Sequence, residues 1–268
     1  IGIPCGKCIG CRLDKARDWA LRCYHESTLY GENNAFLTLT YDDQHLPEHG
    51  TLQKEHFQKF IRKLRKPLRR KNGQKVRYYM CGEYGKPESE GGTERPHYHA
   101  MLFNHQFPDR KFRQIRNGNP VFTSELLSDL WHYGTHEIGS ATFQSAGYTA
   151  RYILKKQNGE PGKATYEARN RIPPYTACSL RPGIGYDFYQ QHKKDIFPRD
   201  YMIAPNGRQV PVPKYYRRLL KDEDPDLFEE LKAKRLAKAE NNPDNSPERL
   251  AARHTNKLNS IKSLKRTL

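Results

Sequence analysis

Two strand-like segments joined by one long loop restrict the fold of this chain more than any other feature. Residues 75–83 and 96–104 are apolar and aromatic, and residues 84–95 between them are rich in Gly, Glu and Pro. This pattern predicts a hairpin. Residues 35–41 alternate apolar side chains with Thr and predict a further strand. The expected fold class is α+β, with a central antiparallel β-sheet flanked by helices rather than parallel βαβ units.

Helices are predicted where apolar residues recur about every 3.6 positions. The helices predicted in this way span residues 12–25, 52–66, 123–133, 145–156 and 215–239, and a short strand is expected within 134–143. Pro67 is expected to end the second helix. Residues 157–213 are rich in Pro and Gly and read as irregular, whereas the tail after residue 231 reads as a weakly packed helix.

The chain carries a large excess of positive charge. Its 268 residues include 47 Lys and Arg against 30 Asp and Glu, a formal net charge of +17. A polyanionic partner is therefore expected, nucleic acid first and an anionic membrane surface second. No run of 18 apolar residues occurs, so no membrane-spanning segment is expected. The first residues also lack the basic and apolar regions of a secretory signal.

Positive charge is concentrated in two segments. Residues 54–75 contain ten Lys or Arg against one acid, and residues 231–268 contain ten against three. Cationic helix faces of this kind are typical of contacts with a DNA backbone, although a solvated face without a partner has the same pattern. The residues predicted to contact DNA are Lys59, Arg62, Lys63, Arg65, Lys66, Arg69, Arg70, Arg151 and Lys156.

His97 and His99 are two residues apart on a predicted strand, so both imidazoles point to the same face and can share a metal ion. Glu83, near the end of the preceding strand, can complete a set of two His and one carboxylate. By ligand type alone this set suits zinc, iron, manganese or magnesium. The alternative is two unrelated histidines and a solvated Glu, because other glutamates occupy the same loop.

Tyr148 and Tyr152 lie four residues apart and share one face of the predicted helix 145–156. Lys155 follows within the next turn. A tyrosine hydroxyl can be a nucleophile, but its ordinary pKa of about 10 requires activation by a metal or a nearby cation. The alternative is an amphipathic helix that simply buries two aromatic side chains.

Cys5, Cys8 and Cys11 are separated by gaps of two residues at the start of the chain. Three thiolates with Cys23 or His25 as a fourth ligand could hold a structural zinc ion. Three reduced thiols, or a disulfide, are the alternatives.

Three motifs, taken in chain order, resemble those of the HUH endonucleases, the initiators of rolling-circle replication. They are Phe36-Leu-Thr-Leu-Thr-Tyr41, His97-Tyr-His99 and Tyr148-x-x-x-Tyr152-x-x-Lys155. Two further stretches resemble replication initiation proteins of microviruses, the single-stranded DNA bacteriophages of the gokushovirus type: Pro4-Cys-Gly-Lys-Cys-Ile-Gly-Cys-Arg12 and Thr40-Tyr-Asp-Asp-Gln-His-Leu-Pro47. The resemblance covers residues 4–156.

The resemblance implies roles for individual residues. His97, His99 and Glu83 would hold one Mg²⁺ or Mn²⁺ ion, Tyr148 and Tyr152 would be nucleophiles, and Lys155 would stabilise negative charge. The implied reaction is site-specific nicking of single-stranded or melted origin DNA. It gives a 5′-phosphotyrosine link and a free 3′-OH primer, and later rejoining releases circular genomes.

The implied organisation has three parts: a cysteine-rich segment and helix packed on the core (1–30), an HUH endonuclease domain (31–213) and a basic helical region (214–268). The expected partners are the phage replication origin, as single-stranded DNA, and the replicative helicase and polymerase of a host. The expected location is the host bacterial cytoplasm. Two rival interpretations are a non-catalytic, zinc-stabilised nucleic-acid-binding protein and an HUH enzyme of the relaxase or transposase type.

Overall fold

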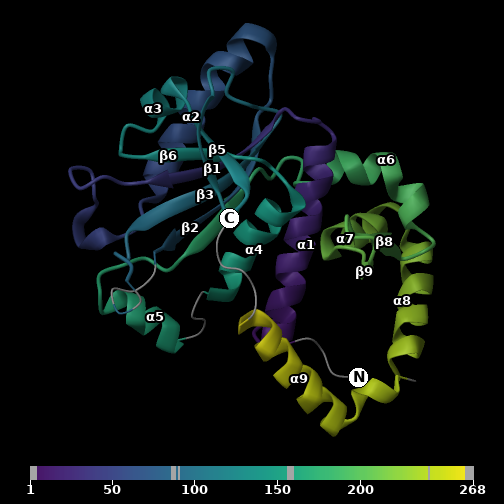
Figure 1. Cartoon of the computed structure of the whole chain (residues 1–268). Coiled ribbons are helices and arrows are strands. Elements are labelled where there is room, and N and C mark those ends of the chain that lie inside the picture. Colours follow the sequence, from purple (N-terminus) through teal and green to yellow (C-terminus); the bar gives the residue numbers. More distant parts are fainter. Residues whose placement is uncertain (1–4, 86–88, 90, 156–159, 241, 263–268) are drawn as a thin grey trace.

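A seven-stranded antiparallel sheet forms the centre of the protein (Figure 1). The computed structural model describes residues 5–85, 89, 91–155, 160–240 and 242–262. The strands follow the spatial order β4-β5-β6-β1-β3-β2-β7. Their bounds are β1 Asn34–Thr40, β2 Arg77–Tyr84, β3 Pro96–Phe103, β4 Lys111–Arg116, β5 Asn119–Thr123, β6 His136–Gly139 and β7 Tyr175–Cys178, and a separate pair is formed by β8 Tyr201–Ile203 and β9 Gln209–Pro211.

Helices flank the sheet and continue beyond it toward the C-terminus (Figure 1). Their bounds are α1 Ile9–Thr28, α2 Lys54–Asn72, α3 Glu125–Leu130, α4 Phe143–Lys155, α5 Glu160–Glu167, α6 Tyr186–Ile196, α7 Lys214–Glu223, α8 Pro225–Glu240 and α9 Pro247–Lys262. The predicted α+β class, with a central antiparallel sheet between helices, is confirmed.

The two faces of the sheet bury different sets of side chains, because neighbouring residues of a strand point in opposite directions. On β1, Leu37 and Leu39 pack in a core cluster with residues of α2 and α3, including Phe60 and Leu127. Phe36 belongs instead to a cluster with residues of α1 and α4, among them Cys23 and Ala146. One face is therefore covered by α2 and α3, and the other by α1 and α4.

The prediction that Pro67 ends the second helix is wrong. Helix α2 continues through Pro67 to Asn72 and ends at Gly73, whose φ of 67° lies in the left-handed region. Proline has no N–H to donate to the carbonyl of Lys63. Lys63 is exposed, so water can solvate this carbonyl instead. Leu64 is buried and Leu68 packs against the same core, so apolar contacts on both sides of the proline hold the helix.

The prediction that residues 157–213 are irregular is also wrong. This stretch supplies α5, α6 and three strands, and β7 extends the main sheet by pairing with β2, with Tyr79 opposite Cys178. The β4–β5 hairpin was likewise not predicted, α3 is shorter than the predicted helix, and the predicted helix 215–239 is divided between α7 and α8. Strands of three or four residues are too short to show a reliable periodicity.

A second core cluster lies beyond the sheet. It consists of Tyr189, Ile196, Phe197, Met202, Val212, Tyr216, Leu220 and Leu231. The cluster contains residues from both sides of position 213, where the sequence suggested a boundary between parts. The division into 1–30, 31–213 and 214–268 stays a prediction, although α1 does pack on the sheet and on α4.

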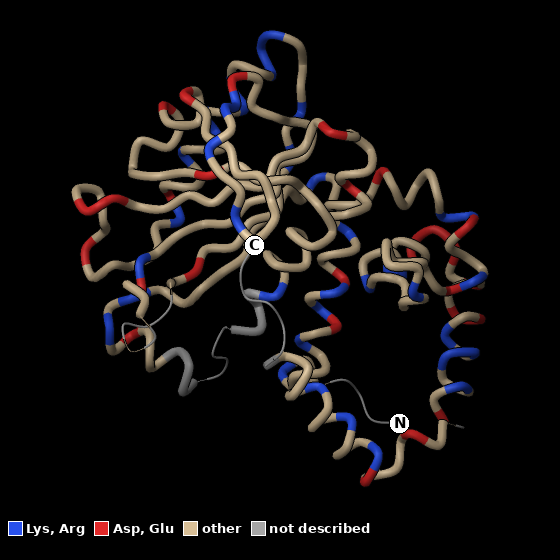
Figure 2. Tube along the Cα trace, viewed as in Figure 1, with Lys and Arg blue, Asp and Glu red and all other residues tan. Residues whose placement is uncertain are grey.

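The last two helices lead back to the beginning of the chain. Helix α9 packs against α1, and Lys and Arg recur along α8 and α9 (Figure 2). Leu231 is the one buried residue of α8, so most of this basic segment contacts solvent. Among the described residues, no helix combines the length and the apolar character needed to cross a membrane.

A buried ion pair ties α1 to the sheet and to the segment before α6. Arg77 donates to Glu26 over 2.5 Å, and the Glu26 side chain is 0% exposed. The other Glu26 oxygen accepts from the backbone N–H of Gly185 at 2.6 Å. Arg77 also donates to the carbonyl oxygen of Pro182. One carboxylate therefore connects three separate parts of the chain.

We expect Glu26→Gln to lower the free energy of unfolding by about 3–5 kcal/mol, because it leaves the buried Arg77 without its counter-ion. Urea unfolding followed by circular dichroism measures this change. The control is Glu230→Gln, which breaks an exposed i,i+4 pair with Lys234 and is expected to change stability by less than about 0.5 kcal/mol. Equal stability of the two variants would contradict a structural role for the buried pair.

Candidate functional site

The backbone pairing of three strands brings the predicted metal ligands together. Glu83 of β2 lies directly opposite His97 of β3, and Thr38 of β1 lies opposite His99. His97 and His99 are two positions apart and so share a face, as predicted. This is the face that α1 and α4 cover, because Phe36, also two positions from Thr38, packs with them.

The three side chains meet around one point. Oε1 of Glu83 lies 2.8 Å from Nε2 of His97 and 3.3 Å from Nε2 of His99. A divalent ion with ligand bonds of about 2.1 Å places neighbouring ligand atoms about 3 Å apart, so the donor set fits a single cation. Burial raises the pKa of Glu83, but hydrogen bonds from His97 and His99 outweigh burial and lower it to about 2. The carboxylate is therefore charged at neutral pH.

Neighbouring groups fix the orientation of both imidazoles. His97 Nδ1 donates to the carbonyl oxygen of Arg95 at 3.1 Å, which leaves Nε2 to face Glu83. The Thr38 hydroxyl lies 3.0 Å from Nδ1 of His99. Such partners hold a histidine ligand in one tautomer and one rotation. Thr38 was not identified as a site residue from the sequence. The alternation of the strand could have indicated it, because Thr38 shares a strand face with Phe36.

Tyr148 lies against this group of ligands. It projects from α4, which packs on α1 and on strands β2 and β3. The Tyr148 and His99 rings meet edge to face, with centroids 5.2 Å apart and planes at 82°. Phe36 stacks on His99 and also contacts the Tyr148 ring, with centroids 6.3 Å apart. The predicted nucleophile and the predicted metal ligands are therefore neighbours in the fold, although they come from distant parts of the sequence.

A groove of about 1290 Å³ opens beside Tyr148 and His99. Its walls come from α1, from the end of the sheet formed by β4, β5 and β6, and from the first turns of α4. The lining residues include Leu13, Ala16, Arg17, Ala20, Thr38, His99, Arg116, Glu137, Tyr148 and Arg151. Arg151 was predicted to contact DNA, whereas Arg17 and Arg116 were not. The groove thus combines apolar side chains with three arginines next to the predicted metal ligands.

Comparison with known proteins assigns the chain to a family. The family model for replication-associated protein ORF2/G2P matches residues 34–157. The chain is 38% identical over 253 residues to replication-associated protein VP4 of Bdellovibrio phage phiMH2K, covering 90% of this chain and 76% of that protein. This chain belongs to the replication-associated proteins of phages. It is also 35% identical over 234 residues to replication-associated protein ORF2 of Spiroplasma virus 4, covering 84% of this chain and 70% of that protein.

The stretch that matches the family model, residues 34–157, begins with β1 and includes all of α4. It therefore includes the three predicted metal ligands as well as Thr38 and Tyr148. A more distant relative, replication-associated protein ORF4 of Chlamydia phage 1, is 27% identical over 224 residues, covering 82% of this chain and 53% of that protein. No solved structure matches the chain.

Three predicted site residues fall on parts that the structure does not describe. Tyr152 and Lys155 belong to α4, but their side chains lie outside the described part of the chain, and Lys156 lies outside it altogether. Their roles stay predictions.

The basic face of α2 lies on the opposite side of the sheet from Tyr148. Lys59, Arg62, Lys63, Lys66, Arg69 and Arg70 are exposed there. Arg65 differs from them, because its guanidinium donates to the carbonyl of Val76 and to the hydroxyl of Ser179. Arg65 thus ties α2 to the residues just before β2 and just after β7. The α2 cations and the groove cannot contact the same phosphate group.

Three of the cysteines lie close together near the beginning of the chain, and Cys23 lies apart from them. The Sγ atoms of Cys5, Cys8 and Cys11 lie within 4.8 Å of one another. The prediction of Cys23 as their fourth ligand is wrong, because Cys23 is fully buried under the sheet. It lies about 18 Å further along α1 than Cys11, at 1.5 Å per residue. His25, the alternative, hydrogen-bonds to the hydroxyl of Tyr216 and stacks on Phe188.

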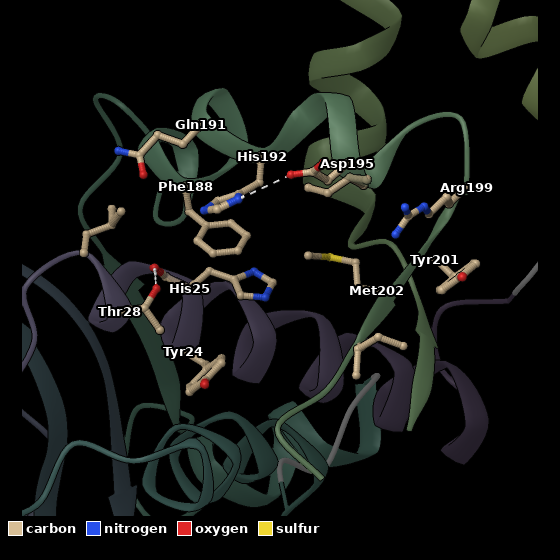
Figure 3. Close-up of a pocket in the computed structure, with 13 residues that line it drawn as sticks. Tyr24, His25, Thr28, Phe188, Gln191, His192, Asp195, Arg199, Tyr201 and Met202 are labelled. Atoms are coloured by element: carbon tan, nitrogen blue, oxygen red, sulfur yellow. Dashed lines mark hydrogen bonds and ion pairs between the residues drawn. The ribbon is translucent and has the colours of Figure 1, made fainter. Parts of the chain in front are cut away.

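A second hollow, of about 680 Å³, lies between α1 and α6 (Figure 3). His25, Phe188 and His192 line it together with Met202. Burial lowers the pKa of His25 to about 3, so this imidazole is neutral at physiological pH. Apart from His25, no predicted site residue lines this hollow, and His25 contacts aromatic neighbours rather than potential metal ligands.

Proposed function

We propose that this replication-associated protein is a metal-dependent DNA nickase and strand-joining enzyme that initiates rolling-circle replication. The observation that carries the proposal is the edge-to-face contact between Tyr148 and His99, within a group of two histidines and one carboxylate. A tyrosine next to three convergent metal ligands, in a groove lined by arginines, suits attack on a phosphodiester. Membership of a family of phage replication-associated proteins supports the same conclusion.

Glu83, His97 and His99 would hold one Mg²⁺ or Mn²⁺ ion. When bound, such an ion supplies Lewis-acid stabilisation of charge on a phosphate oxygen. The residues around the ligands perform a separate task. Thr38 and the Arg95 carbonyl hold the two imidazoles in place, and burial of Glu83 and His99 keeps bulk water away from the ligand atoms.

The reaction exchanges one ester for another. The hydroxyl oxygen of Tyr148 attacks phosphorus and forms a new P–O bond, while the bond from phosphorus to the 3′-oxygen of the preceding nucleotide breaks. The phenolic proton is lost and the leaving 3′-oxygen gains one, so the products are a 5′-phosphotyrosine and a free 3′-OH. No water is consumed, and the ester bond is retained for a later reversal in which a 3′-OH displaces the tyrosine.

A second tyrosine would allow the cycle to repeat. Tyr152 follows Tyr148 by four residues in α4, about one turn of helix. One tyrosine would then hold the first 5′ end while the other cuts the regenerated origin. Lys155 would stabilise the negative charge that develops on phosphate or phenolate.

The expected substrate is single-stranded or melted origin DNA, because phosphorus in a paired duplex would not reach the bottom of the groove. Arg17, Arg116 and Arg151 line this groove, and Glu137 forms a bidentate pair with Arg116. The exposed cations of α2 and of α8–α9 would add contacts to DNA outside the groove. Helicase and polymerase would be supplied by a host cell, whose cytoplasm is the expected place of action.

A covalent-adduct assay tests the proposed function. The full chain is mixed with labelled single-stranded DNA containing an origin of a related phage, with Mn²⁺ or with EDTA, and is resolved on a denaturing gel. We expect a DNA-linked protein band with Mn²⁺ and none with EDTA. Retained binding in a native gel without any adduct, on DNA that a related initiator cuts, would instead support a non-catalytic DNA-binding protein.

A further inference from the structure

Three cysteines that the proposed reaction does not use gather at the beginning of α1. Cys5 and Cys8 precede the helix, Cys11 lies in its first turn, and all three are free thiols. Their Sγ atoms lie within 4.8 Å of one another. A tetrahedral zinc ion with Zn–S bonds of about 2.3 Å places its sulfurs about 3.8 Å apart. The three sulfurs are thus already near the spacing that one ion requires.

Local hydrogen bonding prepares this segment for thiolates. The backbone N–H of Cys8 donates to Sγ of Cys5 at 3.2 Å, and Arg12 N–H donates to the carbonyl of Cys8. Helix α1 begins without a side-chain cap and without an acidic residue in its first turn. Negative charge close to a helix N-terminus is favourable, and here thiolates are the groups that can supply it.

We propose that Cys5, Cys8 and Cys11 bind one Zn²⁺ ion that fastens the beginning of α1. The three thiolates supply three ligands, and water or a side chain outside this trio completes the tetrahedron. A [4Fe–4S] cluster uses the same kind of ligand, but each of its thiolates binds a different iron atom, so the sulfurs must stand further apart. The close approach of the three sulfurs favours a single ion.

The position of this zinc site has a consequence for the groove. Leu13 follows Cys11 by two residues, and Leu13, Ala16 and Arg17 form part of the groove wall beside His99 and Tyr148. The ion would therefore fix the beginning of α1 next to this wall, while contributing nothing to the Glu83 ligand group. Its loss would loosen one wall of the groove and leave the ligands of the catalytic cation in place.

Metal analysis of the full chain tests the proposal independently of nicking activity. Protein purified under reducing conditions and dialysed with Zn²⁺ is expected to retain one thiolate-bound zinc per chain. The Cys5→Ser/Cys8→Ser variant should lose it, and Cys178→Ser should retain it. Because the two histidines and Glu83 also accept zinc, a His97→Ala/His99→Ala variant is needed, and it should still hold the thiolate-bound ion.

Cobalt(II) substitution distinguishes the two sites by spectroscopy, because only thiolate ligands give an intense sulfur-to-metal charge-transfer absorption. We expect this absorption in the wild type and in the histidine variant, and its loss in the Cys5→Ser/Cys8→Ser variant. Hydrogen exchange of residues 9–17 should become faster on addition of a zinc chelator. Absence of zinc from protein with all thiols reduced, iron with visible colour in its place, or retention of charge-transfer absorption by the cysteine variant would each overturn the proposal.

Discussion

Tyr148→Phe is expected to abolish formation of the covalent protein–DNA adduct while leaving the fold and DNA binding unchanged. The substitution removes one oxygen atom and keeps the ring that packs against His99 and Phe36. Loss of a nucleophile from an otherwise intact site lowers the rate by about 10³-fold or more. The measurement is the initial rate of adduct formation on origin-containing single-stranded DNA with Mn²⁺.

Three companion variants make this result specific. Tyr201→Phe is the matched control, since Tyr201 is 36% exposed and lines the hollow between α1 and α6; its adduct rate should equal that of the wild type. Tyr152→Phe is expected to form the first adduct and to fail in the later transfer that releases a circle. The double variant should form no adduct. A wild-type rate for Tyr148→Phe would remove Tyr148 from the role of first nucleophile.

Glu83→Gln is expected to lower the rate of adduct formation by more than about 100-fold at limiting Mn²⁺. This loss is larger than the loss of roughly 10- to 100-fold that is typical when a residue that only hydrogen-bonds to a metal ligand is removed. Glutamine keeps the size of the side chain but removes the buried charge that faces both histidines. Because the defect is one of cation affinity, raising the Mn²⁺ concentration should restore part of the rate. The measurement is adduct rate against Mn²⁺ concentration.

The control for this variant is Glu94→Gln, at a carboxylate that pairs with Arg169 and Arg171 away from the ligands. It is expected to leave the Mn²⁺ dependence unchanged. Thr38→Val keeps the shape of residue 38 but removes the hydroxyl beside His99, and its expected cost is about 10-fold. If Glu83→Gln required no more Mn²⁺ than the wild type, the carboxylate would not be a ligand.

The part of the fold that holds the ligands follows closely from the sequence. Alternation in three strands predicts that His97 and His99 share a face, and the hairpin predicts that Glu83 comes near them. The register confirms this, with Glu83 directly opposite His97. Tyr148 is placed by the packing of α4 on α1 and the sheet, which no local pattern contains. The resemblance to a family supplied that connection.

Other predictions failed where long-range packing decides the outcome. Cys23 resembles a metal ligand in spacing alone, but the apolar face of α1 places it in the core. Pro67 should interrupt a helix, yet contacts of Leu64 and Leu68 with the core carry α2 past it. Strand β7 has four residues and forms because the edge of β2 is available to pair with it. None of these three outcomes can be predicted from the residues nearby in the sequence.

The separation of α2 from the groove by the thickness of the sheet limits what any one piece of DNA can touch. A short oligonucleotide centred on the scissile phosphate can lie in the groove without reaching α2. A longer strand must turn round an edge of the sheet before it meets the α2 cations, and it then releases additional counterions. Substrate length and ionic strength are therefore coupled variables for this protein: salt should weaken the binding of long DNA more steeply than that of short DNA.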